Sequence, residues 1–152
     1  MTPHSRLAAL GITLSPPMPP VAAFVPWMRS GDLVVFLAGH VARQGGQPWV
    51  GRLGTTMATD AGRAAARAVA IDLLGTLNAA VGDLERVEQI VKLLVLVNSA
   101  PTFTEHHLVA NGASELLGEI FGERGAHARS AFGVAQIPFG ACIEIELVAR
   151  VR

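Results

Sequence analysis

An amphipathic helical pattern followed directly by a strongly apolar strand is the feature that most limits the folds open to this chain of 152 residues. From Thr59 onward, apolar side chains recur at helical spacing. This stripe consists of Ala66, Val69, Ala70, Leu73, Leu77, Ala80 and Val81. After Gly82 and Asp83, a nearly continuous apolar run rich in β-branched residues extends from Ile90 to Val97. A one-sided helix that leads into such a run predicts a helix packed on a sheet, with the following strand inside that sheet.

The N-terminal part of the chain combines a proline-rich segment with a hairpin pattern. Four prolines within residues 15–20 cannot enter a helix interior or a central strand, so residues 1–20 are predicted to form a loosely structured lead-in on the surface. Strand-forming residues then flank a turn at residues 30–32, over Phe24 to Arg29 on one side and from Leu33 on the other. This arrangement predicts an antiparallel hairpin.

A second helix and two C-terminal strands complete the predicted architecture. The helix is expected to begin at Thr102, because Thr102 and Glu105 have the spacing of a capping box. Strands are predicted over residues 127–135 and 141–151, and the short turn between them predicts that they pair as a hairpin. The order of elements predicts a single α+β domain over residues 21–152, with a mixed sheet and both helices on one of its faces.

Composition narrows the class of function. Twelve basic and twelve acidic side chains cancel, which disfavours a general nucleic-acid or anionic-membrane binder. Half of the residues are hydrophobic (51%) and few are charged (16%), so a compact chain that associates with itself is expected. The lone cysteine, Cys142, excludes an internal disulfide. The apolar run after Arg6 is too short for a membrane span, and we expect a cytoplasmic protein.

Three charged residues stand in apolar surroundings near the C-terminus. Strand alternation places Glu144 and Glu146 on one face, opposite the aliphatic residues between them. Arg129, on the strand expected to be their hairpin neighbour, is the candidate partner. One interpretation is a structural ion pair within or between subunits. The other is a small-molecule site, because a guanidinium binds a carboxylate with two hydrogen bonds and a nearby glutamate can move a proton.

The same residues resemble a known family. The motifs are AGH at 38–40, VNS at 97–99, ARS at 128–130 and IPFGACIEIE at 137–146. Together they resemble the RidA/YjgF family, also called endoribonuclease L-PSP or translation initiation inhibitor, from about Leu10 to the C-terminus. The resemblance implies a chorismate-mutase-like α+β fold that assembles as a homotrimer, with clefts between neighbouring subunits.

The resemblance also implies an activity and its residues. Family members hydrolyse reactive 2-imino or enamine acids to 2-oxo acids and ammonia, without a metal or organic cofactor. By position, Arg129 would bind the substrate carboxylate and Glu144 would activate water or exchange the imine proton. Backbone groups of Gly39 and Ala131 would orient the reacting end, and Phe24 would form an aromatic wall. Phe24 stands where deaminating members usually have a tyrosine, and Ala38 stands where they often have a serine.

Two other functions fit the same motifs. A non-catalytic protein that binds or senses a 2-oxo acid would use the same arginine. The ribonuclease label of the family suggests RNA cleavage through Arg124, His127 and Arg129, which the neutral charge and the lack of aromatic residues between basic ones make the weaker case.

The remaining polar candidates indicate no second site. Glu105, His106 and His107 are adjacent on a predicted helix and so point in different directions, which argues against a metal site. His127 precedes Arg129 by two residues and is expected to share its strand face. Asn111-Gly112 marks either tight helix packing or an interrupted helix. No role is assigned to His40, and Cys142 is interpreted as a small apolar residue.

Overall fold

The computed structural model describes residues 1–32 and 34–152, so the predicted strand start at Leu33 lies outside the described residues. The helices and strands are α1 (Pro3–Ala9), β1 (Trp27–Ser30), β2 (Val34–Val41), β3 (Arg43–Gln44), β4 (Gln47–Pro48), α2 (Thr59–Val81), β5 (Val87–Asn98), α3 (His106–Phe121), β6 (Ala128–Val134) and β7 (Ile143–Val151). Short 3₁₀ helices are η1 (Leu84–Arg86), η2 (Gly122–Gly125) and η3 (Pro138–Gly140). The predicted hairpin is confirmed as β1 and β2.

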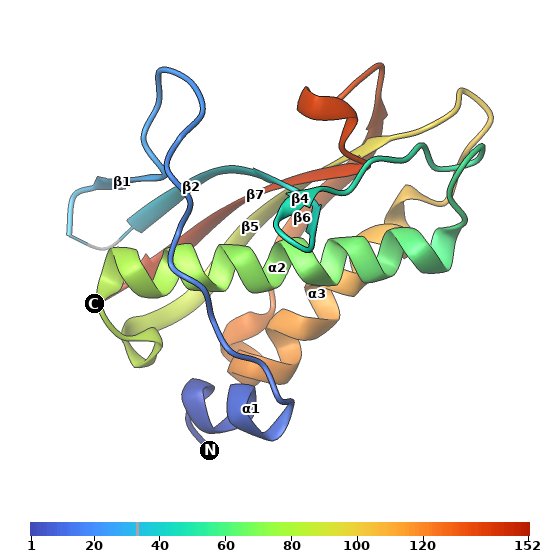
Figure 1. Ribbon diagram of the computed structural model, residues 1–152. Helices are drawn as coiled ribbons and strands as arrows, with labels where there is room; N and C mark the ends of the chain where they lie inside the picture. The colour runs from blue at the N-terminus through green and yellow to red at the C-terminus, as the bar shows by residue number, and fades with distance from the viewer. Residues whose placement is uncertain (33) are drawn as a thin grey trace.

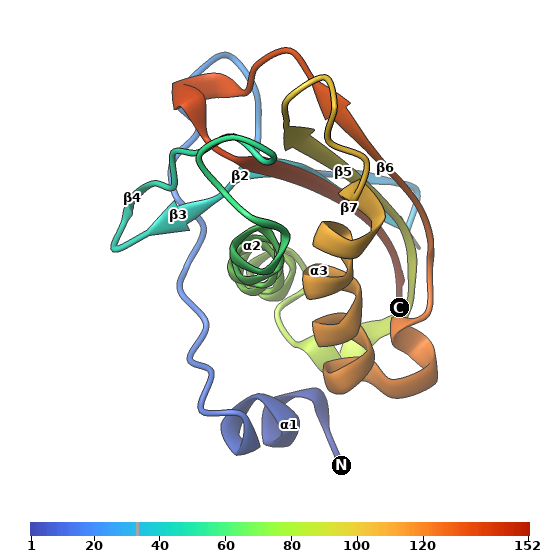
Figure 2. The same cartoon turned by 90° about the vertical axis from the view of Figure 1, so that its right-hand side faces the viewer.

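One mixed sheet and two helices form the body of the molecule. Among the described residues, a five-stranded sheet has the order β1-β2-β7-β5-β6, in which β5 and β6 are parallel and the other pairs antiparallel. Helix α2 packs on β2 and β7, and α3 packs on β5 and β6. Figures 1 and 2 show both helices on the same face of the curved sheet. The predicted α+β class, with both helices on one face, is confirmed.

Helix α2 and strand β5 follow the local pattern closely. The helix begins at Thr59 and ends before Gly82, whose left-handed backbone (φ 83°) suits a residue without a Cβ. Helix α2 is long and apolar enough to cross a membrane. However, 56% of its most apolar 18-residue stretch is buried inside the molecule, as in the core helix of a globular domain. Strand β5 lies between β7 and β6 and buries Leu93, Val95 and Val97 completely.

The two C-terminal strands do not form the predicted hairpin. Strand β6 pairs with β5 in parallel, and β7 lies between β5 and β2. The prediction was wrong because β5, α3 and β6 form a strand-helix-strand unit, which brings β6 back alongside β5 in the same direction. The segment between β6 and β7 therefore passes β5 instead of making a tight turn.

The start of α3 also differs from the prediction. The helix begins at His106, and Glu105 in the N-cap position makes no side-chain capping bond. The carboxylate of Glu105 instead accepts a hydrogen bond from the Thr59 hydroxyl at the start of α2 (Oγ1 to Oε1, 2.7 Å). The capping box predicted for Thr102 and Glu105 is thus wrong, because Glu105 joins two helix starts.

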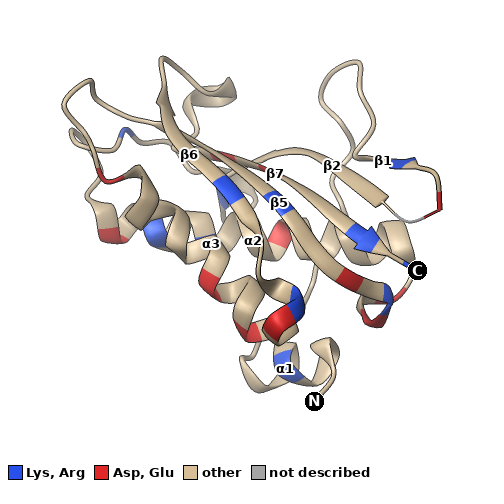
Figure 3. Cartoon of the chain, turned by 180° about the vertical axis from the view of Figure 1, so that it is seen from behind, with Lys and Arg blue, Asp and Glu red and all other residues tan. Residues whose placement is uncertain are grey.

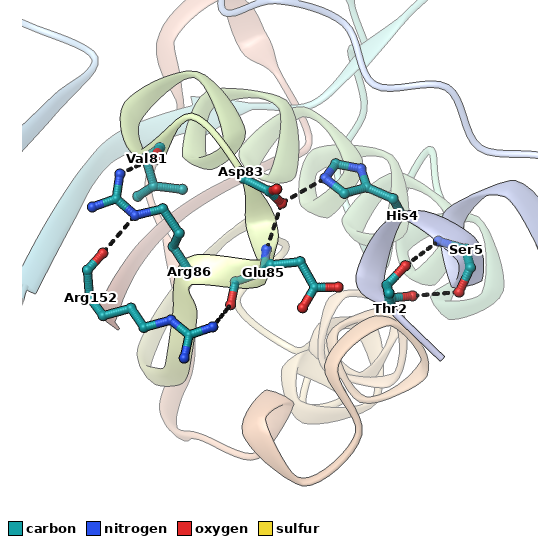
Figure 4. Close-up of polar contacts among 8 residues, drawn as sticks. All are labelled: Thr2, His4, Ser5, Val81, Asp83, Glu85, Arg86 and Arg152. Atoms are coloured by element: carbon teal, nitrogen blue, oxygen red, sulfur yellow. Dashed lines mark hydrogen bonds and ion pairs between the residues drawn. The ribbon is translucent and has the colours of Figure 1, made fainter.

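The predicted lead-in is wrong for its first part, where residues form α1. The Thr2 hydroxyl caps α1 by accepting a hydrogen bond from the Ser5 amide (3.0 Å), and His4 on this helix pairs with Asp83 beyond the end of α2 (3.1 Å) (Figure 4). Leu7 is buried with 3% of its surface exposed, on a helix that contacts α3. The N-terminal helix therefore belongs to the packed body of the protein.

Candidate functional site

Arg129 lies on β6 and faces the helices. Its register partner on β5 is Leu93, a core residue, so the arginine side chain leaves the sheet on the side covered by α3. There its Nη1 donates to the Ser114 hydroxyl (2.9 Å) and its Nη2 donates to the carbonyl oxygen of His107 (2.8 Å). Partial burial lowers the pKa of the Arg129 guanidinium, which remains cationic at neutral pH because its ordinary pKa is so high.

Arg129 is one of the residues that line an open groove of about 420 Å³. Its lining comes from α3, η2 and the start of β6: Asn111, Ser114, Gly118, Gly122, Gly125, Ala126, His127 and Arg129. Most of these lining residues are small, and the others are Asn111, His127 and the cationic Arg129, so a small anion fits the chemistry of the groove.

His127 takes part in the same cluster, as predicted from its spacing to Arg129. Its Nε2 lies 2.9 Å from the Ser114 hydroxyl oxygen, and its Nδ1 lies 2.6 Å from the carbonyl oxygen of Gly125. Burial lowers the pKa of His127, and the nearby charge of Arg129 lowers it further. The Ser114 hydroxyl therefore connects a titratable imidazole to a fixed cation.

Glu144 lies on the opposite, uncovered face of the sheet. Its register partners are Val41 on β2 and Leu96 on β5. Gly39 contacts it closely: a Cβ built on this glycine would lie 3.0 Å from the Glu144 carboxylate. Burial raises the pKa of the Glu144 carboxyl, and the neighbouring charge of Glu146 raises it further. The carboxyl therefore holds a proton more tightly than an ordinary glutamate.

Within one chain, Arg129 and Glu144 do not meet. Strand β5 separates their strands, and the two side chains leave the sheet on opposite faces. In the described part of the chain no ion pair joins Arg129 to Glu144 or Glu146. The expectation that Arg129 stands on the strand next to Glu144 was wrong, because it depended on the hairpin that β6 and β7 do not form.

The other residues predicted for the site are divided between these two places. Ala131 has Val95 as its register partner and packs against the core on the Arg129 side of the sheet. Gly39 lies with Glu144. Phe24 precedes β1 and is 47% exposed. One chain therefore supplies two partial sites, one with Arg129 and one with Glu144.

The structure gives His40 a contact that the sequence could not assign. Its Nδ1 lies 2.7 Å from the carbonyl oxygen of Ala38, and its Nε2 lies 2.7 Å from the Thr76 hydroxyl of α2. Burial lowers the pKa of His40. The imidazole thus connects the irregular part of β2 to the helix that covers it, close to Gly39.

Sequence reasoning missed Ser114, the residue that holds both His127 and Arg129. Its position on the polar side of a predicted helix gave no signal, because its contacts depend on where α3 lies on the sheet.

The structure decides between the two interpretations of Asn111-Gly112, which were tight helix packing and an interrupted helix. Helix α3 is continuous at this point, and a Cβ on Gly112 would collide with the backbone carbonyl of Arg63 on α2. Tight helix packing is therefore the correct interpretation of Asn111-Gly112.

Comparison with known proteins assigns the chain to a family. A family model described as "YjgF/chorismate_mutase-like, putative endoribonuclease" matches residues 4–151. The chain belongs to this family. Protein TCP17 of Trypanosoma cruzi is 42% identical over 150 residues, which cover 97% of this chain and 93% of that protein. The resemblance to RidA/YjgF proteins seen in the motifs is thereby confirmed.

Solved structures of family members agree with the fold. Protein Atu1372 of Agrobacterium tumefaciens, whose function is unknown, is 35% identical, with a TM-score of 0.90 over 99% of this chain and 94% of that chain. A Shewanella oneidensis MR-1 protein with the same endoribonuclease description is 30% identical, with a TM-score of 0.95 over 99% of this chain and 100% of that chain.

Proposed function

We propose that this protein is a RidA-like deaminase that hydrolyses reactive 2-imino acids, of the 2-aminoacrylate type, to 2-oxo acids and ammonia. The observation that carries the proposal is the fixed guanidinium of Arg129 in a groove of small residues. Its bonds to Ser114 and His107 use two of the five N–H donors of an arginine and orient the remaining ones. An oriented guanidinium binds a carboxylate with two parallel hydrogen bonds.

Glu144 supplies the proton chemistry in this proposal. A carboxyl with a raised pKa is protonated more often near neutral pH and is therefore a better general acid. It donates its proton to the imine nitrogen, and water then adds to the carbon atom while one proton of that water moves to the nitrogen. The resulting protonated carbinolamine loses ammonia as its hydroxyl proton returns to Glu144, which leaves the 2-oxo acid. This sequence consumes one water molecule and needs no metal or organic cofactor.

The proposed site combines two subunits, because Arg129 and Glu144 of one chain face opposite sides of the sheet. We propose a homotrimer in which Arg129 of one protomer and Glu144 of its neighbour border the same cleft. The uncovered face of the sheet supports association, since Phe36 and Phe132 on it are 45% and 47% exposed. Measurement of mass in solution tests the assembly, and a stable monomer would contradict it.

We propose a cytoplasmic location for this protein, which suits the unpaired thiol of Cys142.

A second function, binding of a small carboxylate without turnover, is favoured by one observation. The Arg129 groove forms within a single chain, and the described residues that line it include no acidic side chain. Such a groove binds a 2-oxo acid whether or not Glu144 of a neighbour reaches it. RNA cleavage is the weaker alternative, because the twelve basic residues are balanced by twelve acidic ones, and Figure 3 shows basic and acidic positions distributed over both helices and strands.

Decay of 2-iminobutanoate generated in situ separates these functions. The proposal predicts that Arg129→Ala and Glu144→Gln each lower the rate at least about a hundredfold, the scale typical for loss of a general acid. Glu88→Gln is the control, since it changes a glutamate that pairs with Arg150 and takes no part in the site, and its rate is expected to stay within about threefold. Equal rates for wild type, Arg129→Ala and Glu144→Gln would reject catalysis here. RNA cleavage that survives Arg129→Ala would place any nuclease activity elsewhere.

A further inference from the structure

The cluster of His127, Ser114 and Arg129 contains a hydrogen-bond chain whose direction can be deduced. The carbonyl oxygen of Gly125 only accepts, so the His127 Nδ1 atom beside it carries a proton. In the neutral imidazole, Nε2 is then an acceptor, and the Ser114 hydroxyl donates to it. The same hydroxyl oxygen accepts from Nη1 of Arg129. With His127 neutral, the only hydroxyl proton of Ser114 is therefore turned away from the groove ligand.

Protonation of His127 reverses one bond of this chain. Nε2 becomes a donor toward the Ser114 oxygen, which then accepts from both His127 and Arg129. The Ser114 proton must leave Nε2 and is free to point into the groove. The groove gains one hydroxyl donor and a second positive charge, both of which favour a bound anion.

We propose that His127 acts through Ser114 as a positioning residue that couples proton uptake to the binding of a small carboxylate at Arg129. This inference rests on the proposed function for its ligand class and adds a residue and a regulation to that site. By linkage, a carboxylate in the groove strengthens proton binding by His127 as much as protonation strengthens carboxylate binding. Affinity for the carboxylate therefore rises as the pH falls through the titration of His127.

The elements that pack around His127 carry other ionisable groups. They are Arg129 on β6, Glu123 and Arg124 on η2, and His107, Glu115 and Glu119 on α3. Arg124 donates to the carbonyl of Val87, and Glu115 and Glu119 pair with Arg63 and Arg67. Arg129 is the charged group that acts on the pKa of His127. Glu144 lies on the opposite face of its own chain, but in the proposed trimer Glu144 of a neighbouring protomer borders the same cleft. The variants of His127 are therefore compared in a Glu144→Gln background, which removes the titration of Glu144.

The test uses 2-oxobutanoate as a stable probe and measures its Kd calorimetrically between pH 5 and 8. For wild type we expect binding at least about fivefold tighter at pH 5 than at pH 8, within the usual range of coupling between two sites, together with proton uptake. His127→Gln retains a polar side chain but cannot become cationic, and in the Glu144→Gln background it is expected to lose this dependence. Ser114→Ala is expected to reduce it. His4→Gln, at an exposed histidine on α1, is the matched control and is expected to behave as wild type.

A second measurement does not depend on the ligand. In the unliganded protein, NMR signals of the Arg129 guanidinium are expected to shift with the titration of His127, and this shift is expected to be smaller in Ser114→Ala. Guanidinium signals that do not change as His127 titrates would overturn the inference. Equal 2-oxobutanoate affinity at all pH values in wild type and His127→Gln would also overturn it, while leaving the proposed function intact. If the signals respond but 2-oxobutanoate does not bind at any pH, the inferred coupling to carboxylate binding is overturned, and the 2-iminobutanoate assay decides the proposed function separately.

Discussion

Gly39 and Glu144 are in direct contact across neighbouring strands: a Cβ at residue 39 would lie 3.0 Å from both Cδ and Oε2 of the glutamate. The contact occurs where the pairing of β2 with β7 shifts register, between Leu37 and His40. Irregular pairing of this kind redirects side chains at a sheet edge or a site. The absence of a side chain at Gly39 leaves the space in which the Glu144 carboxylate lies.

The first prediction follows from this contact. Gly39→Ala is expected to change the free energy of unfolding by less than about 1 kcal/mol, because the obstructing group is the flexible end of a side chain. The carboxylate must move aside, so the rate of 2-iminobutanoate hydrolysis is expected to fall at least about tenfold, since small displacements of reacting groups are costly. Thermal unfolding and the hydrolysis assay measure the two effects. Unchanged stability with an unchanged rate would contradict the role of Gly39.

Glu144 also makes stability depend on pH. Its pKa is raised in the folded protein, so the folded state binds the proton more tightly than the unfolded state does. Stability contributed by this group is present below its unfolded pKa and is lost as the pH rises through the folded value. Glu144→Gln is therefore expected to raise the unfolding temperature at pH 7, with a gain that shrinks toward pH 4. A lower unfolding temperature than wild type at pH 7 would contradict this prediction.

The N-terminal helix is expected to contribute to stability. Leu7 is 3% exposed, so Leu7→Ala is predicted to cost about 2–5 kcal/mol in the free energy of unfolding, as for other buried leucines. Leu10, just beyond the same helix, is 43% exposed, and Leu10→Ala should cost less than about 0.5 kcal/mol. Denaturant titration of both variants measures the difference. Equal effects would mean that α1 does not pack as described.

Local patterns predicted the fold where the decisive interactions are local. The apolar spacing from Thr59 to Val81 predicts helix α2, and Gly82 predicts where the helix ends. Turn residues predict the hairpin of β1 and β2. Strand β6 pairs with β5, and this pairing depends on where α3 packs on the sheet. No pattern within residues 127–135 contains that information, so sequence order suggested the wrong neighbour.

The same distinction applies to the candidate site. Alternation along a strand correctly placed His127 and Arg129 on one face, because two residues two positions apart share a side of the sheet. The Ser114 contact joins a helix to a strand and depends on tertiary packing. The separation of Arg129 from Glu144 likewise follows from strand order rather than from either local sequence.

Cys142 is expected to be unreactive in the folded protein. It is fully buried, and burial raises the pKa of its thiol to about 11. Since the thiolate is the reacting form, a chromogenic disulfide reagent at pH 8 should modify it slowly in the native protein and rapidly after denaturation. Complete modification of the native protein at the rate of the denatured one would contradict its burial.

The packing of α3 on α2 provides a final prediction with an internal control. Gly112 lies so close to α2 that a Cβ would collide with the Arg63 carbonyl oxygen, a backbone atom that moves only if the whole helix moves. Gly112→Ala is therefore expected to destabilise the protein by about 1–3 kcal/mol or more, as overpacking does.

Gly118, on the same helix, provides the control, because it is exposed and a Cβ added there would have nothing within 4 Å. Gly118→Ala is expected to stabilise the protein by about 0.5–1 kcal/mol, because alanine loses less backbone entropy in a helix. Denaturant unfolding of the two variants gives opposite signs if α2 and α3 pack as described, and a shared sign would contradict that packing.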